Sequence, residues 1–442
     1  MKFIQYNNQM KIGLNYGNTE FSFVLPDDSI VYKSNYELIS NPASELMLDS
    51  ILHPVASPPL SELILNRKPG NVVIVVSDIT RPIPYKEFLP ELVAVLEQNG
   101  VERSEITILV ATGMHRASTH EEHLKMFGIH ITENYRIVDH DCSNENELLE
   151  LNELSWSGSK IRLNKQYVEA GFRIVTGLVE PHFMAGFSGG RKAICPGLVS
   201  FDGVRKFHGY RFLSDPNAAT SILENNPCHM ENTSIAKLCP PDFSINVVLD
   251  NHKKINKIIS GELFASHHKA VEFVKERCCP VVHQQADLAI TSSGGYPLDA
   301  TFYQCVKGFV NCLPAVKPLS EIISFGSCLE GIGSSEYTEV MKKYSGKHLQ
   351  FIEDIKENRF FIKDQWQFQM HIRTLEKIGI RNLHFYTSNL SLSDLSQLSV
   401  RPYSMAADQI EAAIQNQIDQ AVKDKKQIAI FPEGPYCSPI AI

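Results

Sequence analysis

The sequence predicts an α/β protein of two domains, each built on a mostly parallel β-sheet. Short apolar runs rich in Val and Ile alternate along the chain with amphipathic segments of helical period. Runs that are apolar throughout are typical of strands buried on both faces, and their alternation with helices favours a parallel sheet. The pattern restarts near residues 278–280, which divides the chain into a domain of residues 1–279 and a domain of residues 280–442.

Composition restricts the class of protein. With 442 residues, 43% hydrophobic and 21% charged, the chain is long enough to bury two cores and is not disordered. No run reaches the roughly 18 apolar residues of a membrane helix, and no secretory signal is visible, so we expect a cytoplasmic protein. The net charge of −8 disfavours nucleic acid as a partner. The ten cysteines form no C-x-x-C pair, which favours reduced thiols over a zinc ribbon.

The first domain begins with residues 1–35, whose alternation of polar and apolar residues predicts a small antiparallel β element. The run Val72–Ser77 is apolar and β-branched throughout and predicts a central strand. The other predicted elements are helices over Ala43–Ser50, Tyr85–Gln98, Thr119–Phe127 (with a Thr119–Glu122 capping box), Phe201–Phe207 and Glu262–Arg277, strands over Ile106–Ala111, Tyr135–Asp139 and Phe172–Thr176, and a hairpin of Ser244–Val248 with Ile255–Ile259.

The second domain repeats this alternation of strands and helices. Its predicted strands are Ala286–Thr291, Ile322–Phe325, Leu383–Tyr386 and Gln427–Phe431, and its predicted helices are Ala300–Asn311, Gln365–Ile378 and Ala406–Val422. Residues 211–240 are polar and contain the dipeptide Asp215-Pro216. Such residues can line a pocket and set its specificity, and their secondary structure is not evident from the sequence.

Four loops that follow predicted strands carry unusual polar content: residues 77–82, 112–116, 180–192 and 292–308. Ligands of open α/β sheets bind beyond the carboxyl ends of the strands. Because all four loops leave strands at that end, their shared placement predicts functional sites, although each loop alone is a weak signal.

The first two loops contain groups suited to acid–base chemistry and anion binding. In Asp78-Ile79-Thr80-Arg81, the guanidinium of Arg81 can hold a carboxylate or phosphate, or pair with Asp78 merely to fix the turn. His115 can act as a general base near neutral pH, or be an ordinary hydrogen-bonded loop histidine.

The loop of residues 180–192 is the richest in chemistry. Its glycines let backbone amides approach an anion, and Arg191 and Lys192 add positive charge. It matches neither the Walker A nor the dinucleotide-binding motif, and Lys192 read alone is as consistent with phosphate binding. His182 and His208 lie 26 residues apart, so their spacing does not argue for a metal. Imidazole suits nickel, copper or zinc if the two residues converge.

In the second domain, Gln304 and Lys307 lie three residues apart on a predicted helix and therefore share a face. They can reach a polar ligand, or form a solvated helix face. Trp366 is one of two tryptophans, and a place in the core is its simplest interpretation.

Together these residues resemble the lactate racemase family, whose members racemise or epimerise 2-hydroxy acids with a nickel-pincer nucleotide. The resemblance runs from about Asp78 to Trp366. It is carried by Asp78-x-x-Arg81-Pro82, Thr112-Gly113-x-His115-Arg116, Glu180-Pro181-His182, Gly186-Phe187-Ser188-Gly189-Gly190-Arg191-Lys192, His208, Gly294-Gly295-Tyr296-Pro297, Tyr303-Gln304-x-x-Lys307 and Trp366. One departure is Ala117, where close relatives are expected to have Pro.

The resemblance implies an active site in a cleft between the two domains. It implies a pyridinium-3,5-bisthiocarboxylate mononucleotide attached to Lys192 through a thioamide. Nickel would be held by atoms of this group and by His208, so that Lys192 and His208 make up the metal site. The cofactor would lie against Asp78, Ile79, Thr80, Arg81, Ser188, Gly189 and Gly190. Cofactor-maturation proteins would be partners of the chain.

The resemblance also assigns the reaction. His115 and His182 would be paired acid/bases, and Arg81, Gln304, Lys307 and Trp366 would bind a small 2-hydroxy acid. Racemisation by proton-coupled hydride transfer passes through a planar keto acid, and each enantiomer directs its hydroxyl at a different base. The alternative is a non-nickel oxidoreductase or a small-molecule-binding protein on the same scaffold, although a dehydrogenase should carry a glycine-rich dinucleotide motif that this sequence lacks. The particular hydroxy acid does not follow from the sequence.

Overall fold

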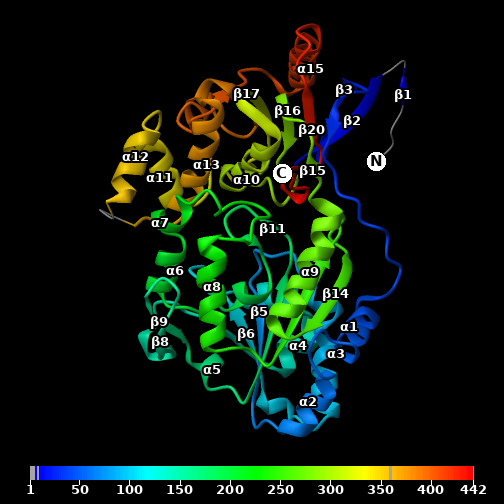
Figure 1. Ribbon diagram of the computed structural model, residues 1–442, viewed down its shortest axis with the longest axis vertical. Helices are drawn as coiled ribbons and strands as arrows, with labels where there is room; N and C mark the ends of the chain where they lie inside the picture. The colour runs from blue at the N-terminus through cyan, green and yellow to red at the C-terminus, as the bar shows by residue number, and fades with distance from the viewer. Residues whose placement is uncertain (1–4, 7–8, 358–360, 442) are drawn as a thin grey trace. The chain divides into compact units, whose positions relative to one another are not determined.

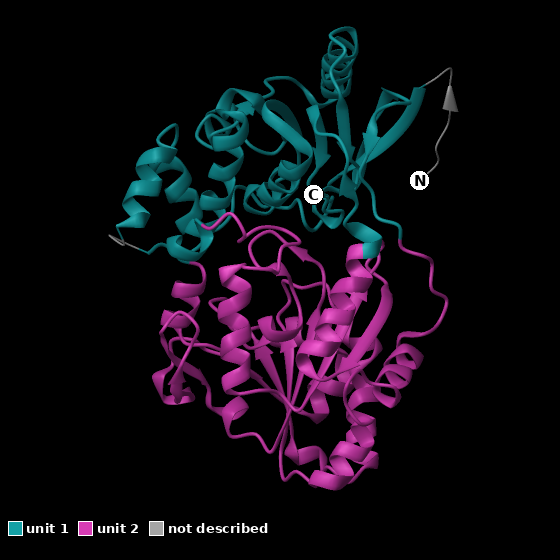
Figure 2. Ribbon diagram, viewed as in Figure 1, with its two compact units in different colours: residues 1–35, 209–214, 276–442 teal, residues 36–208, 215–275 magenta. Residues whose placement is uncertain are grey.

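A computed structural model describes residues 5–6, 9–357 and 361–441. The chain forms two compact units, shown in Figure 2. Unit 1 contains residues 1–35, 209–214 and 276–442, and unit 2 contains residues 36–208 and 215–275. Both units are α/β with mostly parallel sheets, as the sequence predicts.

Unit 2 is built on a six-stranded sheet with the strand order β14-β13-β10-β5-β6-β7, of which Figure 1 labels β5, β6 and β14. Neighbouring strands are parallel except for the β13–β14 hairpin. The strands are β5 (Val72–Ser77), β6 (Ile106–Ala111), β7 (Arg136–Asp139), β10 (Phe172–Leu178), β13 (Phe243–Leu249) and β14 (Ile255–Gly261). The order reverses between β5 and β10, and crevices that bind ligands form at such reversals in open sheets.

The helices of unit 2 cover this sheet and bury a core that β5, β6 and α3 share. They are α1 (Ala43–Leu52), α2 (Leu60–Arg67), α3 (Leu89–Gln98), α4 (His120–Asn134), α5 (Lys165–Val168), α6 (Phe201–Phe207), α8 (Pro227–Leu238) and α9 (Leu263–Cys278), with short hairpins of β8 (Leu148–Leu154) with β9 (Lys160–Asn164) and of β11 (Pro181–His182) with β12 (Gly186–Phe187).

Several helices of unit 2 differ from expectation: α2 and α5 were not predicted, and α4 continues to Asn134, beyond the predicted end at Phe127. The helix predicted over Tyr85–Gln98 opens as a separate 3₁₀ turn before α3 begins, with Pro90 in the first turn of α3. α8 lies inside the segment 211–240 that the sequence left unassigned. Its start is marked by local chemistry, because the Asn226 side chain accepts hydrogen bonds from the backbone of Cys228 and His229.

Unit 1 contains a second six-stranded sheet, which is entirely parallel, in the order β19-β18-β17-β16-β20-β4. Its strands are β4 (Ile30–Val31), β16 (Ala286–Ser292), β17 (Val316–Phe325), β18 (Leu383–Tyr386), β19 (Arg401–Pro402) and β20 (Ile428–Phe431). Its other elements are β1 (Gln5–Tyr6), β2 (Gln9–Tyr16), β3 (Thr19–Pro26), α7 (Tyr210–Leu213), β15 (Val281–Val282), α10 (Phe302–Asn311), α11 (Ser335–Lys343), α12 (His348–Lys356), α13 (Gln365–Ile378), α14 (Leu392–Leu395), α15 (Ala407–Lys423) and β21 (Ile440–Ala441).

The N-terminal β element forms as predicted but belongs to unit 1 rather than to the domain expected over residues 1–279. β2 and β3 pair antiparallel, and β4 adds to the edge of the C-terminal sheet beside β20. The backbone amides of Ser22 and Val24 donate to Glu411 and Gln415 of α15. Phe23 is fully buried in the core of this unit. Alternation of side chains predicts such a hairpin but not the surface that buries its apolar face.

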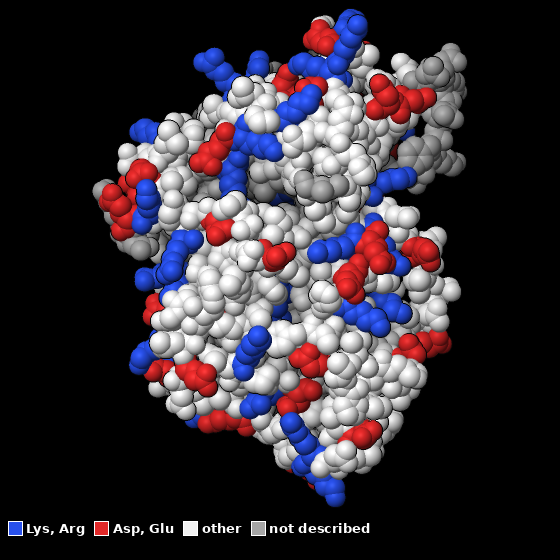
Figure 3. Space-filling view, viewed as in Figure 1, with Lys and Arg blue, Asp and Glu red and all other residues white. Residues whose placement is uncertain are grey.

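Acidic and basic side chains are interspersed on the face seen in Figure 3. Within the described residues, no helix is both long and apolar enough to cross a membrane. All ten cysteines are buried, and none forms a disulfide.

The two tryptophans allow each unit to be monitored separately, because Trp156 lies in unit 2 and Trp366 in unit 1. In a Trp156→Phe background, we expect Phe23→Ala to lower the free energy of unfolding of unit 1 by about 3–5 kcal/mol, the usual cost of removing a buried Phe. The measurement is urea denaturation followed by Trp366 fluorescence. Val24→Ala is the matched control, because Val24 is 38% exposed. Equal effects of the two substitutions would contradict the placement of the hairpin.

Candidate active site

Three neighbouring strands of unit 2 end at one edge of the sheet, where the loops predicted to be functional begin. β5 leads into Asp78, β6 leads into the loop of His115, and β10 leads into the segment from Glu180 to Lys192. The strand order reverses between β10 and β5, and β6 is the next strand beside β5. The three loops therefore leave the sheet at the position where open α/β sheets bind ligands.

Asp78 holds the ring of His115. Oδ2 of Asp78 lies 2.5 Å from Nδ1 of His115, and Oδ1 accepts from the hydroxyl of Thr80 at 2.6 Å. Burial would raise the pKa of Asp78, but hydrogen bonds from His115 and Thr80 and the nearby Arg81 outweigh it and lower that pKa. A carboxylate at Nδ1 fixes the proton on that nitrogen, which leaves Nε2 of neutral His115 as an acceptor.

His182 lies on β11, and its Nδ1 faces hydrogen-bond donors where that of His115 faces a carboxylate. Its Nδ1 accepts hydrogen bonds from the backbone amides of Met184 at 3.3 Å and Ala185 at 3.2 Å. A nitrogen that accepts N–H groups carries no proton, so the neutral ring has its proton on Nε2. The ring is 8% exposed, whereas the side chain of His115 is half exposed. The site therefore contains one imidazole with an accepting Nε2 and one with a donating Nε2.

Arg81 forms an ion pair with Glu180, with 3.2 Å between Nη1 and Oε1. Both side chains are about one-third exposed or less. Arg81 thus retains donors for a further anion. The sequence left open an ion pair of Arg81 with Asp78 that would fix the turn. The structure instead pairs Arg81 with Glu180, and Asp78 forms hydrogen bonds with His115 and Thr80.

The glycine-rich loop folds back on the end of β10. The hydroxyl of Ser188 donates to Leu178 at 2.7 Å and accepts from the amide of Glu180 at 3.0 Å. Gly189 and Gly190 have φ of +77° and +50°. A Cβ on Gly190 would lie 2.8 Å from the ring of His267. Glycine is therefore required here both by the backbone conformation and by the close approach of α9.

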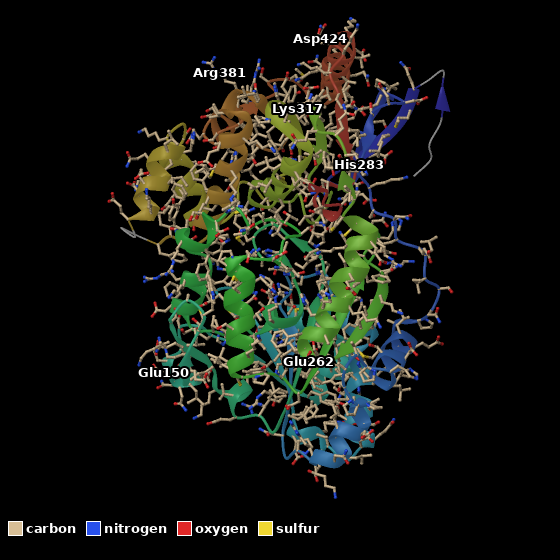
Figure 4. All side chains as sticks on the ribbon, viewed as in Figure 1. Glu150, Glu262, His283, Lys317, Arg381 and Asp424 are labelled. Atoms are coloured by element: carbon tan, nitrogen blue, oxygen red, sulfur yellow. The ribbon has the colours of Figure 1, made fainter. Side chains whose placement is uncertain are left out.

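Arg191 is buried and holds this loop in place through hydrogen bonds. It is 1% exposed and donates to Asn232 at 3.1 Å, to His267 Nε2 at 2.7 Å, and to the carbonyls of Ala185 and Phe187. Burial lowers the pKa of its guanidinium to about 9, which leaves it charged at neutral pH. His267 is carried by α9, whose first turn is capped by the carboxylate of Glu262, labelled in Figure 4.

Lys192 is half-buried, and the positive charge of its amine is disfavoured. Burial, with the neighbouring charges of Arg81 and Arg191, lowers the pKa of Lys192 to about 7. Nζ lies 5.1 Å from the centre of the Phe207 ring, which packs edge-on against His208 with 5.0 Å between ring centres. Burial and then the charge of Lys192 lower the pKa of His208 to about 3. Lys192 therefore presents an amine that is neutral in part, and His208 a neutral imidazole.

The three other predicted site residues lie in unit 1. Gln304 and Lys307 are half-buried in α10, and Trp366 begins α13 and donates from Nε1 to the hydroxyl of Tyr303 at 3.0 Å. Oε1 of Gln304 is buried without a hydrogen-bond partner among the described residues. Trp366 is 7% exposed, in line with its simpler interpretation as a core residue, and it also contacts the helix that carries Gln304.

No group of three or more His, Cys, Asp or Glu side chains in the described part of the chain is arranged to hold a metal ion. A metal held by the protein alone therefore has no ready site in residues 5–6, 9–357 and 361–441. A metal here would need ligands from a bound group.

Sequence reasoning missed several residues that build the site. Asn232 and His267 anchor Arg191 from elements 41 and 76 residues away along the chain. Phe207, between Lys192 and His208, was taken as part of an ordinary helix. No motif marks these residues, because their roles depend on packing between distant segments.

Comparison with known proteins identifies the family. Residues 16–221 match the model of the lactate racemase N-terminal domain, and residues 281–436 match that of the lactate racemase C-terminal domain. The chain belongs to the lactate racemase family. It is 35% identical to the lactate racemase of Thermoanaerobacterium thermosaccharolyticum over 96% of this chain and 97% of that protein. It is also 35% identical to the lactate racemase of Lactiplantibacillus plantarum over 75% of this chain and 77% of that protein.

Solved structures agree with this assignment to the lactate racemase family. The lactate racemase apoprotein from T. thermosaccharolyticum superposes with a TM-score of 0.86 at 32% identity, covering 98% of this chain and 100% of the other. A protein from Thermotoga maritima superposes with a TM-score of 0.63 at 16% identity, covering 93% of this chain and 100% of the other. The second likeness shows a shared fold only.

The lowered pKa of Lys192 predicts a pH-dependent stability of the chain without cofactor. The folded-state pKa of about 7 lies below the ordinary value of 10.5, so the unfolded chain binds more protons between these values. The free energy of unfolding should therefore rise with pH above 7, by up to about 1.4 kcal/mol per pH unit. Lys192→Met should remove this slope in urea denaturation between pH 7 and 9.

The matched control for this prediction is Lys68→Met, because Lys68 is exposed. It should keep the wild-type slope. Parallel slopes for wild type and Lys192→Met would show that Lys192 is not held with a lowered pKa.

Proposed function

We propose that this protein racemises small 2-hydroxy acids, with lactate as the first substrate to test. The observation that carries the proposal is the contrast at Nδ1 of His115 and His182, a carboxylate in one case and two backbone amides in the other, from loops at one sheet edge. Inverting a carbinol centre requires that a proton be taken from the substrate oxygen and returned to it. Membership of the lactate racemase family along nearly the whole chain supports this use of the pair.

A nickel-pincer nucleotide fits the donors of unit 2. A lysine that is neutral in part can form the thioamide, and a neutral imidazole suits nickel. Lys192 would hold the nucleotide covalently, His208 would complete the metal coordination, and the amides near Gly189 and Gly190 would face its phosphate. When bound, this group would accept and return the hydride of the substrate carbon, which is chemistry that no protein side chain supplies.

The protein side chains would then supply orientation and proton transfer. Arg81 has donors free of Glu180 to bind the substrate carboxylate, and Lys307 and Gln304 would add contacts from unit 1. His115 would take the hydroxyl proton at Nε2, with the carboxylate of Asp78 compensating the positive charge that results. His182 would return a proton from Nε2 to the oxygen of the opposite enantiomer, and the two histidines would exchange these roles in the reverse direction. Trp366 would limit the space beside the substrate.

Replacing either histidine should abolish racemisation in both directions, because each direction needs both. His115→Ala and His182→Ala should each lower kcat by at least about a hundredfold, the usual range for a lost general acid–base. Each variant should still form a stoichiometric trace of 2-keto acid from one enantiomer, measured after acid quenching. We expect opposite enantiomers to react in the two variants, and the same preference in both would refute the pairing.

Removing His208 should separate metal binding from attachment of the nucleotide. In protein produced together with the cofactor-maturation proteins, His208→Ala should keep the mass increase on the Lys192 peptide and lose most of its nickel. The matched control is His229→Ala, because His229 is likewise a histidine whose pKa burial lowers to about 3. Equal nickel content in His208→Ala and wild type would contradict the proposed ligand.

A further inference from the structure

The chain leaves unit 2 immediately after His208. Residues 209–214 belong to unit 1, and the chain returns to unit 2 at Asp215 (Figure 2). Within this excursion lies α7, a single helical turn of Tyr210–Leu213. His208 is thus joined by one peptide bond to a segment whose packing is that of the other unit.

α7 is held by α13 and α12 of unit 1. Phe212 and Leu213 are buried, so the contact has an apolar part. It also has a polar part, because Nε2 of Gln369 donates to the carbonyl of Tyr210 at 3.4 Å and Nη2 of Arg373 donates to that of Leu213 at 2.6 Å. Gln369 and Arg373 lie four residues apart on α13 and therefore share a face.

The bond from Arg373 is the stronger of the two by distance and by charge. A helix of one turn makes few hydrogen bonds of its own and is not stable alone. The carbonyl of Leu213, its last residue, has no partner within such a turn. The guanidinium of Arg373 donates to this carbonyl as a charged partner, and the bond fixes the end of α7 against α13.

We propose that Arg373 is a positioning residue for His208. It anchors residues 209–214 on α13, and because Gly209 follows His208 directly, this anchor restricts the backbone of His208 and thereby its imidazole. The proposal rests on the proposed function in one respect, which is that His208 completes the nickel site. The anchor itself is a property of the chain without cofactor.

Lys377 provides a matched control on the same helix. It lies four residues beyond Arg373 and donates to the carbonyl of Leu313 at 2.6 Å, so it makes the same kind of bond to a segment other than α7. Arg373→Ala and Lys377→Ala therefore each remove one charged donor to a backbone carbonyl.

The first test uses hydrogen exchange of the apoprotein, followed by mass spectrometry of peptides that cover residues 201–214. We expect exchange of residues 209–214 to be about tenfold faster in Arg373→Ala, because local opening reports the loss of a charge-assisted bond. Arg373→Lys keeps a donor and should restore most of the protection. Gln369→Leu should give a smaller change in the same direction, and Lys377→Ala should give none.

The second test uses protein loaded with nucleotide and nickel. Arg373→Ala should lose nickel to a chelator several-fold faster than wild type while the mass increase on Lys192 is unchanged. Its kcat should fall about tenfold and its KM should stay within about twofold, because substrate contacts are untouched. Arg373→Lys should recover most of both properties, and Lys377→Ala should behave as wild type.

The two tests separate the inference from the proposed function. Equal exchange of residues 209–214 in Arg373→Ala and Lys377→Ala would overturn the anchor, and unchanged nickel loss in Arg373→Ala would overturn its effect on His208. Wild-type protein with neither mass increase nor nickel would instead contradict the proposed function, and the exchange result would still decide the anchor.

Discussion

The site depends on how the protein accommodates the buried guanidinium of Arg191 beside the half-buried amine of Lys192. Taking a guanidinium out of water is costly unless all its donors are used. The acceptors of Arg191 are all neutral, namely Asn232, His267 and the carbonyls of Ala185 and Phe187. Its charge is thus not cancelled by an acid, and it helps to lower the pKa of the neighbouring Lys192. The same bonds fix the loop that presents His182.

The arrangement of the two histidines follows from this framework. His182 receives its two amide hydrogen bonds from Met184 and Ala185, and Ala185 is also held by Arg191. His115 is held separately by Asp78, at the end of the neighbouring central strand. The different chemistry of the two rings therefore comes from what each loop places at Nδ1, a backbone in one case and a carboxylate in the other.

The sequence predicts the sheets well because their strands carry a strong local signal. Val72–Ser77 and Ile106–Ala111 are apolar throughout, and the structure gives them the predicted bounds. The loops that follow such strands were recognisable because parallel strands end at one edge. The pairing of Arg81 with Glu180, the anchoring of Arg191 by His267 and the excursion of residues 209–214 were not predictable, since each depends on contacts between segments far apart in sequence. The roles assigned to individual site residues rest on resemblance and stay predictions.

The position of β4 has a consequence for the order of events during biosynthesis. β4 precedes all of unit 2 in the chain and its partner β20 follows it, so unit 2 is synthesised between the two strands. Domains generally fold as they emerge, so unit 2 can acquire its structure while the N-terminal hairpin still lacks α15 and β20. During that interval the apolar face around Phe23 has nothing to cover it. The nascent chain therefore carries an exposed hydrophobic hairpin that a chaperone can bind, until α15 and β20 have been translated and can cover it.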